Sequence, residues 1–225
     1  MNRRVFALLP LCLLGLFVSS SFSQKQDITA ARFNELIEQA TVKRALVSYR
    51  EKESRTGYDA GTSTEYMREQ LPPDRSRALI VQKNITGITR TEVIWIGDFK
   101  YVKLNEGEWK KEEAQQFTGA SGSGSGNGSG IASSKPDIKE SYEYLGTEKL
   151  NGVVTDHYQT TKTITLNLSN GSHVRKNSRS CWYNKDGMLI KMLFEDRIGP
   201  LVYRVVTEYD YDVNLKIEAP EIKSR

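Results

Sequence analysis

The sequence predicts a mainly β (α+β) protein. We expect a single curved antiparallel sheet of about ten strands that forms an open half-barrel, with an N-terminal helix packed on or across its concave face. One segment near the start shows the 3.6-residue period of an amphipathic helix, and from about Arg44 onward the apolar period changes to two. The strand-like runs are joined by short turn sequences such as Asn151-Gly152. Sequential hairpins of this kind indicate a meandering antiparallel sheet.

The first 23 residues have the pattern of a secretory signal peptide. Basic Arg3 and Arg4 precede an apolar run from Val5 to Val18, and the small residues of Ser21-Phe22-Ser23 suit a cleavage site. The apolar run is shorter than a membrane-spanning helix needs. We therefore expect residues 1–23 to be removed near Ser23/Gln24 and the remaining chain to be exported, to the periplasm or out of the cell.

One helix is predicted at the start of the mature chain. The i, i+3, i+4, i+7 spacing places a single apolar stripe on it, formed by Phe33, Leu36, Ile37 and Ala40. Asp27 or Thr29 can cap its N-terminus. A helix of about thirteen residues is roughly 20 Å long, so it would act as a lid over only part of a broad sheet.

Strands are predicted along almost all of the remaining chain. The β-rich runs are Ala45–Arg50, Glu65–Leu71, Arg77–Lys83, Ile88–Ile96, Phe99–Leu104, Tyr142–Leu145, Val153–Leu168, Arg179–Tyr183, Met188–Glu195 and Leu201–Val213, with a last short run at Leu215–Ile217. The turns of three hairpins are expected at residues 97–98, 151–152 and 184–187.

Residues 24–225 are expected to form one domain. The Gly- and Ser-rich segment 119–134 interrupts the strand pattern and is expected to be a flexible loop, because it cannot bury apolar area. It could instead link two domains. The strands before and after it look alike and neither half is obviously self-sufficient, so we expect a loop within one sheet.

The charge balance argues against two classes of partner. Without Arg3 and Arg4 the chain carries 30 basic and 28 acidic residues. This near-neutrality gives no electrostatic case for binding nucleic acid. It also gives no case for a polybasic membrane anchor, so any membrane contact is expected to be peripheral.

The sequence contains no catalytic or metal-binding motif. His157 and His173 stand apart, and Cys181 is the one cysteine left once Cys12 leaves with the signal peptide. A histidine within a strand and a small buried cysteine are the simpler interpretations of His157 and Cys181. No Gly-x-Ser-x-Gly elbow, His-Glu-x-x-His helix or phosphate-binding glycine loop occurs. We expect no catalytic residue, metal or cofactor, and no enzymatic activity.

Apolar side chains gather on one face of several strands, most clearly in the run 188–195. If one short helix covers part of a broad sheet, the remaining apolar concavity is either filled by large side chains or left as a pocket for an apolar ligand. The residues expected to line such a cavity are Trp95, Tyr101, Trp182, Met188, Met192, Phe194, Tyr203 and Val205.

Several stretches of this layout are similar to those of a known family. They are residues 93–101 (VIWIGDFKY), 144–153 leading into His157-Tyr158, 181–191 (CWYNKDGMLIK), 211–214 and 217–220, and together they span most of residues 28–220. The chain thereby resembles the periplasmic lipoprotein-carrier superfamily with the LolA, LolB and LppX type of fold. The resemblance implies an exported, unclosed β-barrel whose mouth is covered by helices and whose interior takes acyl chains. The sequence shows no clear second or third lid helix.

Two functions are therefore expected and remain open. The first is a soluble exported protein that binds a lipid or acyl chain in the half-barrel, in envelope lipid or lipoprotein trafficking. Burying a sixteen-carbon chain contributes about 10 kcal/mol before the costs of association. The alternative is a non-enzymatic envelope interaction module with a filled core, which binds a protein partner through its convex face or sheet edge.

Overall fold

A computed structural model describes residues 25–58, 61–113, 136–168 and 171–222 of the chain. The predicted signal peptide (residues 1–23) and the Gly- and Ser-rich segment (residues 119–134) lie outside these ranges, so both stay predictions, as does the division into domains. No helix within the described ranges is long and apolar enough to cross a membrane.

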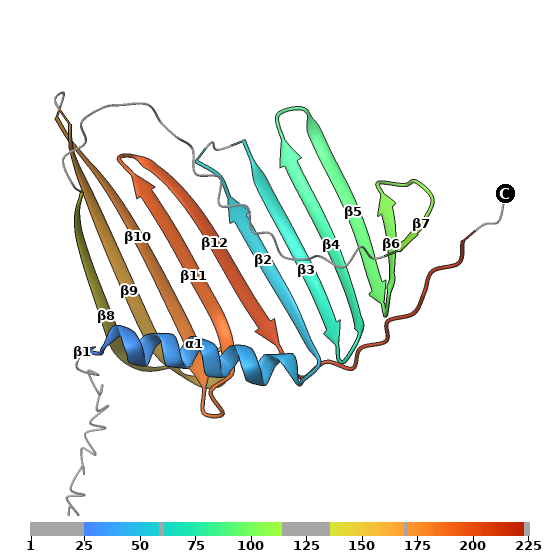
Figure 1. Ribbon diagram of the computed structural model, residues 1–225, viewed down its shortest axis with the longest axis horizontal. Helices are drawn as coiled ribbons and strands as arrows, with labels where there is room; N and C mark the ends of the chain where they lie inside the picture. The colour runs from blue at the N-terminus through green and yellow to red at the C-terminus, as the bar shows by residue number, and fades with distance from the viewer. Residues whose placement is uncertain (1–24, 59–60, 114–135, 169–170, 223–225) are drawn as a thin grey trace, which may run out of the picture.

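The described strands form one twelve-stranded antiparallel sheet that is not closed (Figure 1). Its strand order is β1-β8-β9-β10-β11-β12-β2-β3-β4-β5-β6-β7. The elements are β1 (Gln26–Asp27), α1 (Ala30–Ala45), β2 (Tyr49–Thr56), β3 (Ser63–Leu71), β4 (Arg75–Asn84), β5 (Gly87–Ile96), β6 (Phe99–Leu104), β7 (Lys110–Glu113), β8 (Asp137–Leu150), β9 (Val153–Leu168), β10 (Gly171–Asn184), β11 (Leu189–Ile198) and β12 (Leu201–Asp210). The predicted fold class, a mainly β open half-barrel with one helix near the N-terminus, is confirmed.

The helix begins at one of the two predicted caps. The Thr29 Oγ1 atom accepts a hydrogen bond from the backbone N–H of Arg32 at 3.1 Å. The helix then continues to Ala45, and β2 starts only at Tyr49. The strand predicted at Ala45–Arg50 is therefore wrong over most of its length. The basic residues of the last helical turn complement the helix dipole and favour helix at that point.

Short turns join the strands where they were predicted. Asn151 and Gly152 have φ angles of 48° and 89°, and they connect β8 to β9 as a two-residue hairpin turn requires. Gly97, with a φ of 54°, connects β5 to β6 in the same way. The hairpin between β10 and β11 across residues 184–187 is also present. The three predicted hairpins are confirmed.

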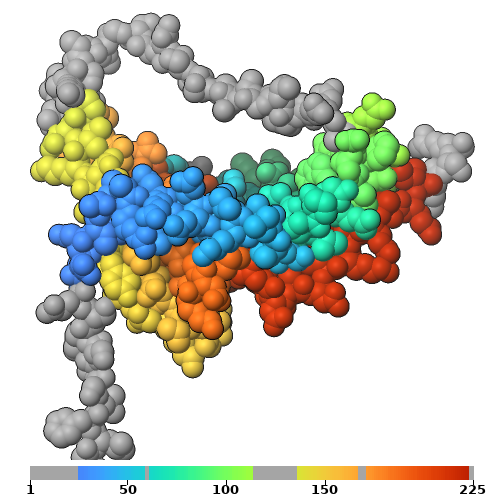
Figure 2. Space-filling view, turned by 60° about the horizontal axis from the view of Figure 1, so that its bottom comes forward, coloured from blue at the N-terminus to red at the C-terminus, as the bar shows by residue number. Residues whose placement is uncertain are grey.

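Two segments outside the sheet pack on its opposite faces, near the same end of the strands. Helix α1 crosses one face, where Phe33 and Ala40 are buried against Cys181 of β10 (Figure 1). Residues 211–222 form the C-terminal segment, and its Ile217 packs on Ile94 of β5 on the other face. Figure 2 shows the helix and this C-terminal segment on opposite sides of the sheet. We call the two sides the helix face and the tail face, and the cross-strand register assigns each strand residue to one of them.

The C-terminal segment contains no strand at Leu215–Ile217, so that prediction is wrong. Ile217 is only 2% exposed, and Arg75 Nη1 donates a hydrogen bond to its carbonyl oxygen at 3.2 Å. The Ile217 side chain is buried by packing against the face of the sheet. Its burial therefore does not require the segment to pair as another strand.

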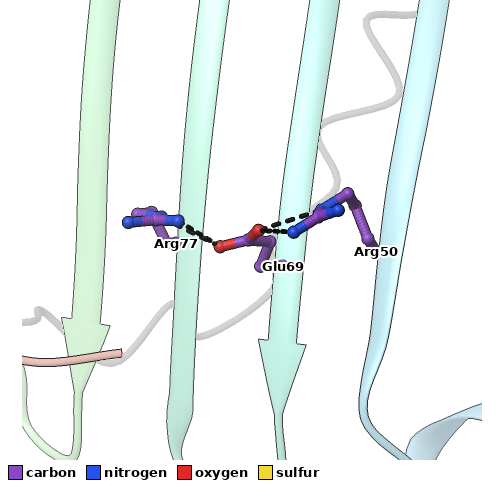
Figure 3. A network of polar contacts seen from close by, with 3 residues as sticks. All are labelled: Arg50, Glu69 and Arg77. Atoms are coloured by element: carbon purple, nitrogen blue, oxygen red, sulfur yellow. Dashed lines mark hydrogen bonds and ion pairs between the residues drawn. The ribbon is translucent and has the colours of Figure 1, made fainter. Parts of the chain in front are cut away.

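A charged network lies on the tail face of three neighbouring strands (Figure 3). The carboxylate of Glu69 on β3 is 3% exposed and accepts hydrogen bonds from Arg50 of β2 at 2.9 and 2.7 Å. It also accepts hydrogen bonds from Arg77 of β4 at 3.0 and 2.5 Å. The three residues are direct cross-strand partners, so the network fixes the register of β2, β3 and β4.

Candidate ligand-binding site

The helix leaves two small hollows between itself and the sheet. A hollow of about 220 Å³, the flank hollow, is lined by Phe33 and Asn34 of the helix and by Glu140, Tyr142, Thr160, Lys162, Asn177, Ser178, Arg179 and Phe194 of the sheet. A hollow of about 160 Å³, the under-helix hollow, is lined by Ile37, Ala40, Thr41, Arg44, Arg179, Cys181, Tyr183, Leu189, Met192 and Tyr209. Arg179 is a wall of both hollows, so they meet at this side chain.

A third hollow lies on the helix face beyond the end of the helix. It has a volume of about 450 Å³ and is lined by Tyr66, Arg68, Ser76 and Trp95 of β3, β4 and β5. Helix α1 lies over the other half of the sheet and ends beside β2 (Figure 1). The helix face is therefore covered by α1 in one half only.

Five of the eight predicted lining residues lie on the helix face. Phe194 lines the flank hollow, Met192 lines the under-helix hollow and Trp95 lines the third hollow. Val205 of β12 is the cross-strand partner of Phe194. The ring of Tyr203 meets the ring of Phe194 edge-on, with 6.4 Å between centroids.

The predicted apolar stripe of the helix faces the sheet. Phe33 and Ala40 are buried, and Leu36 and Ile37 pack against the same cluster. The ring of Phe33 lies 5.8 Å from the ring of Tyr142 on β8. The role of the stripe as a lid stays a prediction.

Tyr101 and Trp182 lie on the tail face, which corrects the expectation that all eight residues line one surface. Tyr101 packs against Ile217 of the C-terminal segment. Trp182 stacks on His157 at 4.2 Å and donates its indole N–H to Glu148. Alternation within a strand assigns residues to two faces, but it does not say which face of one strand continues that of the next.

The remaining predicted residue, Met188, lies in the turn before β11. Its backbone N–H donates to Asn184 Oδ1 at 2.9 Å. The register between β10 and β11 shifts nearby, as in a β-bulge. As a result Leu189 joins Met192 beneath the helix. The period of two in the sequence carries no sign of this shift.

Most cations around the hollows are already neutralised. Lys162 and Arg175 form ion pairs with carboxylates at 2.8 and 2.5 Å. Arg44 lies over two tyrosine rings, 5.0 and 5.8 Å from their centroids. Arg179, by contrast, makes no hydrogen bond or ion pair with any described residue. Within the described part of the chain it is an unpaired cation beside both hollows.

Burial controls the titration of the groups beneath the helix. It raises the pKa of the Cys181 thiol to about 11 and the pKa of Tyr209 to about 12. Burial also raises the pKa of Tyr183 well above its ordinary value. All three groups are therefore protonated at neutral pH, so Cys181 is a poor nucleophile and Tyr183 can act as a hydrogen-bond donor.

The other titratable residue considered from the sequence, His157, lies on the tail face. Its Nδ1 atom is 3.0 Å from a carboxylate oxygen of Glu148, and burial lowers its pKa. Among the residues that the structure describes, no three His, Cys, Asp or Glu side chains are placed to hold a metal ion.

A hollow on the tail face was missed by the sequence reasoning. It has a volume of about 520 Å³, and its apolar walls are Met67, Leu79, Val81 and Val206, with Lys52, Glu65 and Glu208 among its other residues. Leu79 and Val81 alternate along one strand, so the pattern was visible in the sequence. It could not be recognised as a surface because Met67 and Val206 come from distant segments.

Comparisons with known proteins show no family and only a low structural similarity. No protein-family model and no curated protein match the chain. Among solved structures, the chain is similar to a LolA superfamily protein from Nitrosomonas europaea, with 11% sequence identity and a TM-score of 0.29. The match covers 84% of this chain and 94% of that one. At this TM-score the likeness carries no argument about the fold or about a ligand.

Proposed function

We propose that this chain is an exported, non-enzymatic protein that binds a hydrophobic ligand, a lipid or acyl chain, on the helix face of its half-barrel. Its process would be envelope lipid or lipoprotein trafficking. The observation that carries the proposal is the incomplete seal between α1 and the sheet, which leaves the flank and under-helix hollows on either side of Arg179.

Part of the wall of each hollow suits an apolar chain, and the rest of the flank hollow is polar. Phe33 and Phe194 supply aromatic faces in one hollow, and Met192 supplies a thioether that adapts to different shapes in the other. Each hollow is smaller than the roughly 300–1,000 Å³ typical of small-molecule sites. The two hollows meet at Arg179, so a ligand of that size would occupy both, beneath a helix held to the sheet by one apolar stripe.

The proposal is tested with the neutral fluorescent probe N-phenyl-1-naphthylamine and its displacement by dodecanol. Met192→Asn should weaken probe binding about tenfold, because it places an amide in an apolar hollow. The matched control is Leu193→Asn, the next residue of β11, whose side chain lies on the tail face. Equal effects of the two substitutions, or no probe binding by the unaltered protein, would contradict the proposal.

The tail-face hollow favours the alternative function, which is binding of a protein partner on that face. Under this alternative, Leu79→Asp should abolish capture of a purified envelope partner and leave probe binding on the helix face unchanged. If Leu79→Asp instead abolishes probe binding while Met192→Asn does not, the tail face is the ligand site.

A further inference from the structure

Two buried polar atoms without hydrogen-bond partners lie on the helix face of β10. Within the described residues, three buried side-chain polar atoms make no hydrogen bond: His157 Nε2, Asn177 Oδ1 and Tyr183 Oη. Asn177 and Tyr183 lie on the same face of the same strand, on either side of Arg179. Folded proteins leave few such atoms unsatisfied, so two of them beside a free cation call for a physical explanation.

These groups open into the two hollows beside the helix. Tyr183 is 3% exposed and lines the under-helix hollow, Asn177 lines the flank hollow, and Arg179 lines both. Alternate residues of a strand lie about 6.8 Å apart on one face. Asn177 is one such step from Arg179 and Tyr183 is two steps away on the other side, so Arg179 stands between the two unsatisfied groups and shares one hollow with each. The thiol of Cys181 is the nearest alternative partner for Tyr183, and a thiol is a weak one.

The chemistry of the cluster suits an anion. Arg179 offers five N–H donors in a planar fork, and Tyr183 offers an O–H donor. Such donors bind carboxylate and phosphate oxygens through short, charge-assisted hydrogen bonds. The neighbouring cations Lys162 and Arg175 are already held by carboxylates, and Arg44 lies over two tyrosine rings. Among the described residues around the hollows, Arg179 is therefore the cation left to receive a negative charge.

We propose that Arg179 and Tyr183 hold the anionic head of an amphipathic ligand, a carboxylate or phosphate, whose apolar chain lies in the flank hollow against Phe33 and Phe194. Asn177 Oδ1 accepts a hydrogen bond from a hydroxyl of the head or from a water bound to it. This assignment rests on the proposed function and names the chemical class of its ligand.

A binding role and a packing role for Tyr183 predict opposite effects of one substitution. The hydroxyl is buried and unsatisfied in the free protein, so Tyr183→Phe should leave stability unchanged or raise it. The same substitution should weaken anion binding about threefold to tenfold, because a donor to the head is lost. A tyrosine that only packs would show no such loss of binding.

The decisive experiment compares three twelve-carbon ligands in displacement of N-phenyl-1-naphthylamine: dodecanoate, dodecyl phosphate and dodecanol. The unaltered protein should bind at least one of the two anions about tenfold more tightly than the alcohol. Arg179→Gln should remove that preference and leave dodecanol affinity within about twofold. Lys176→Gln is the matched control, because it removes one positive charge from an exposed side chain of the same strand on the tail face.

The outcomes distinguish a failure of the head assignment from a failure of the proposed function. Equal affinity for dodecanol and both anions, or equal losses in Arg179→Gln and Lys176→Gln, overturns the head assignment while leaving apolar binding in place. Binding of none of the three ligands removes the proposed function together with the head assignment. A preference for one anion over the other identifies the head as a carboxylate or a phosphate.

Discussion

Replacing Glu69 by glutamine should destabilise the fold by about 2–4 kcal/mol. The carboxylate is 3% exposed and receives four guanidinium hydrogen bonds of 2.5–3.0 Å from Arg50 and Arg77. Removing one partner of a fully buried ion pair costs about 3–5 kcal/mol. Here the two arginine side chains are 34% and 43% exposed, so water compensates part of their charge and lowers the cost. Glutamine keeps the shape but turns its amide N–H groups toward a guanidinium.

Urea unfolding at pH 7, followed by tryptophan fluorescence, measures this cost. The midpoint should fall at an unchanged m-value, because the surface exposed on unfolding does not change. Glu112→Gln is the control, since its contact with Lys100 at 3.3 Å is solvent-exposed and should contribute less than about 1 kcal/mol. A loss for Glu69→Gln no larger than that of Glu112→Gln would show that the network in Figure 3 does not hold the three strands.

Three further predictions concern the C-terminal segment, an acidic group and the cysteine. Ile217→Ala should lower the free energy of unfolding by about 2–4 kcal/mol in the same urea assay. Ile222→Ala, at a 43% exposed position, should lower it by less than about 0.5 kcal/mol. Similar losses for the two substitutions would mean that Ile217 does not anchor the segment. Hydrogen bonding from Arg175 lowers the pKa of Asp196, so its stabilisation should be complete above the unfolded pKa of about 4 and be lost as the pH falls through the lower folded pKa. A stability difference between the unaltered protein and Asp196→Asn that stays constant from pH 7 to 2 would contradict this. Cys181, with a pKa of about 11, should react with a disulfide reagent at pH 8 at least about tenfold more slowly in the folded protein than in urea; equal rates would show that the thiol is not buried.

The strands and turns could be predicted from the sequence because the signals for them are local. Asn151-Gly152 forms its turn with the positive φ angles that these two residues tolerate best. The strand pairing of Tyr101 could also have been predicted from the sequence. A two-residue turn at Gly97-Asp98 pairs Ile96 with Phe99 and hence Ile94 with Tyr101, which places Tyr101 on the face opposite Trp95. Combining the turn length with the alternation would have removed this residue from the predicted cavity.

The rest of the candidate site depends on contacts between distant segments. The shift between β10 and β11 moved Leu189 under the helix, and nothing in the period of two predicts it. The significance of Arg179 appears only when its neighbours are seen to be paired, because a lone arginine in a strand sequence carries no sign of its partners. Tyr183 likewise becomes informative only once its hydroxyl is found buried beneath α1.

The positions of the two covering segments explain how a one-layer sheet is stabilised across its width. A sheet must bury one face against another layer. Helix α1 supplies that layer for β8 to β11 on one face, and residues 211–222 supply it for β5 and β6 on the other. The helix leads directly into β2, and the C-terminal segment leaves directly from β12, and these two strands pair with each other. Arg44 at the end of the helix lies over Tyr49 of β2 and Tyr209 of β12. A displacement of α1 from the sheet would therefore act on the strand pair that joins the two halves of the sheet.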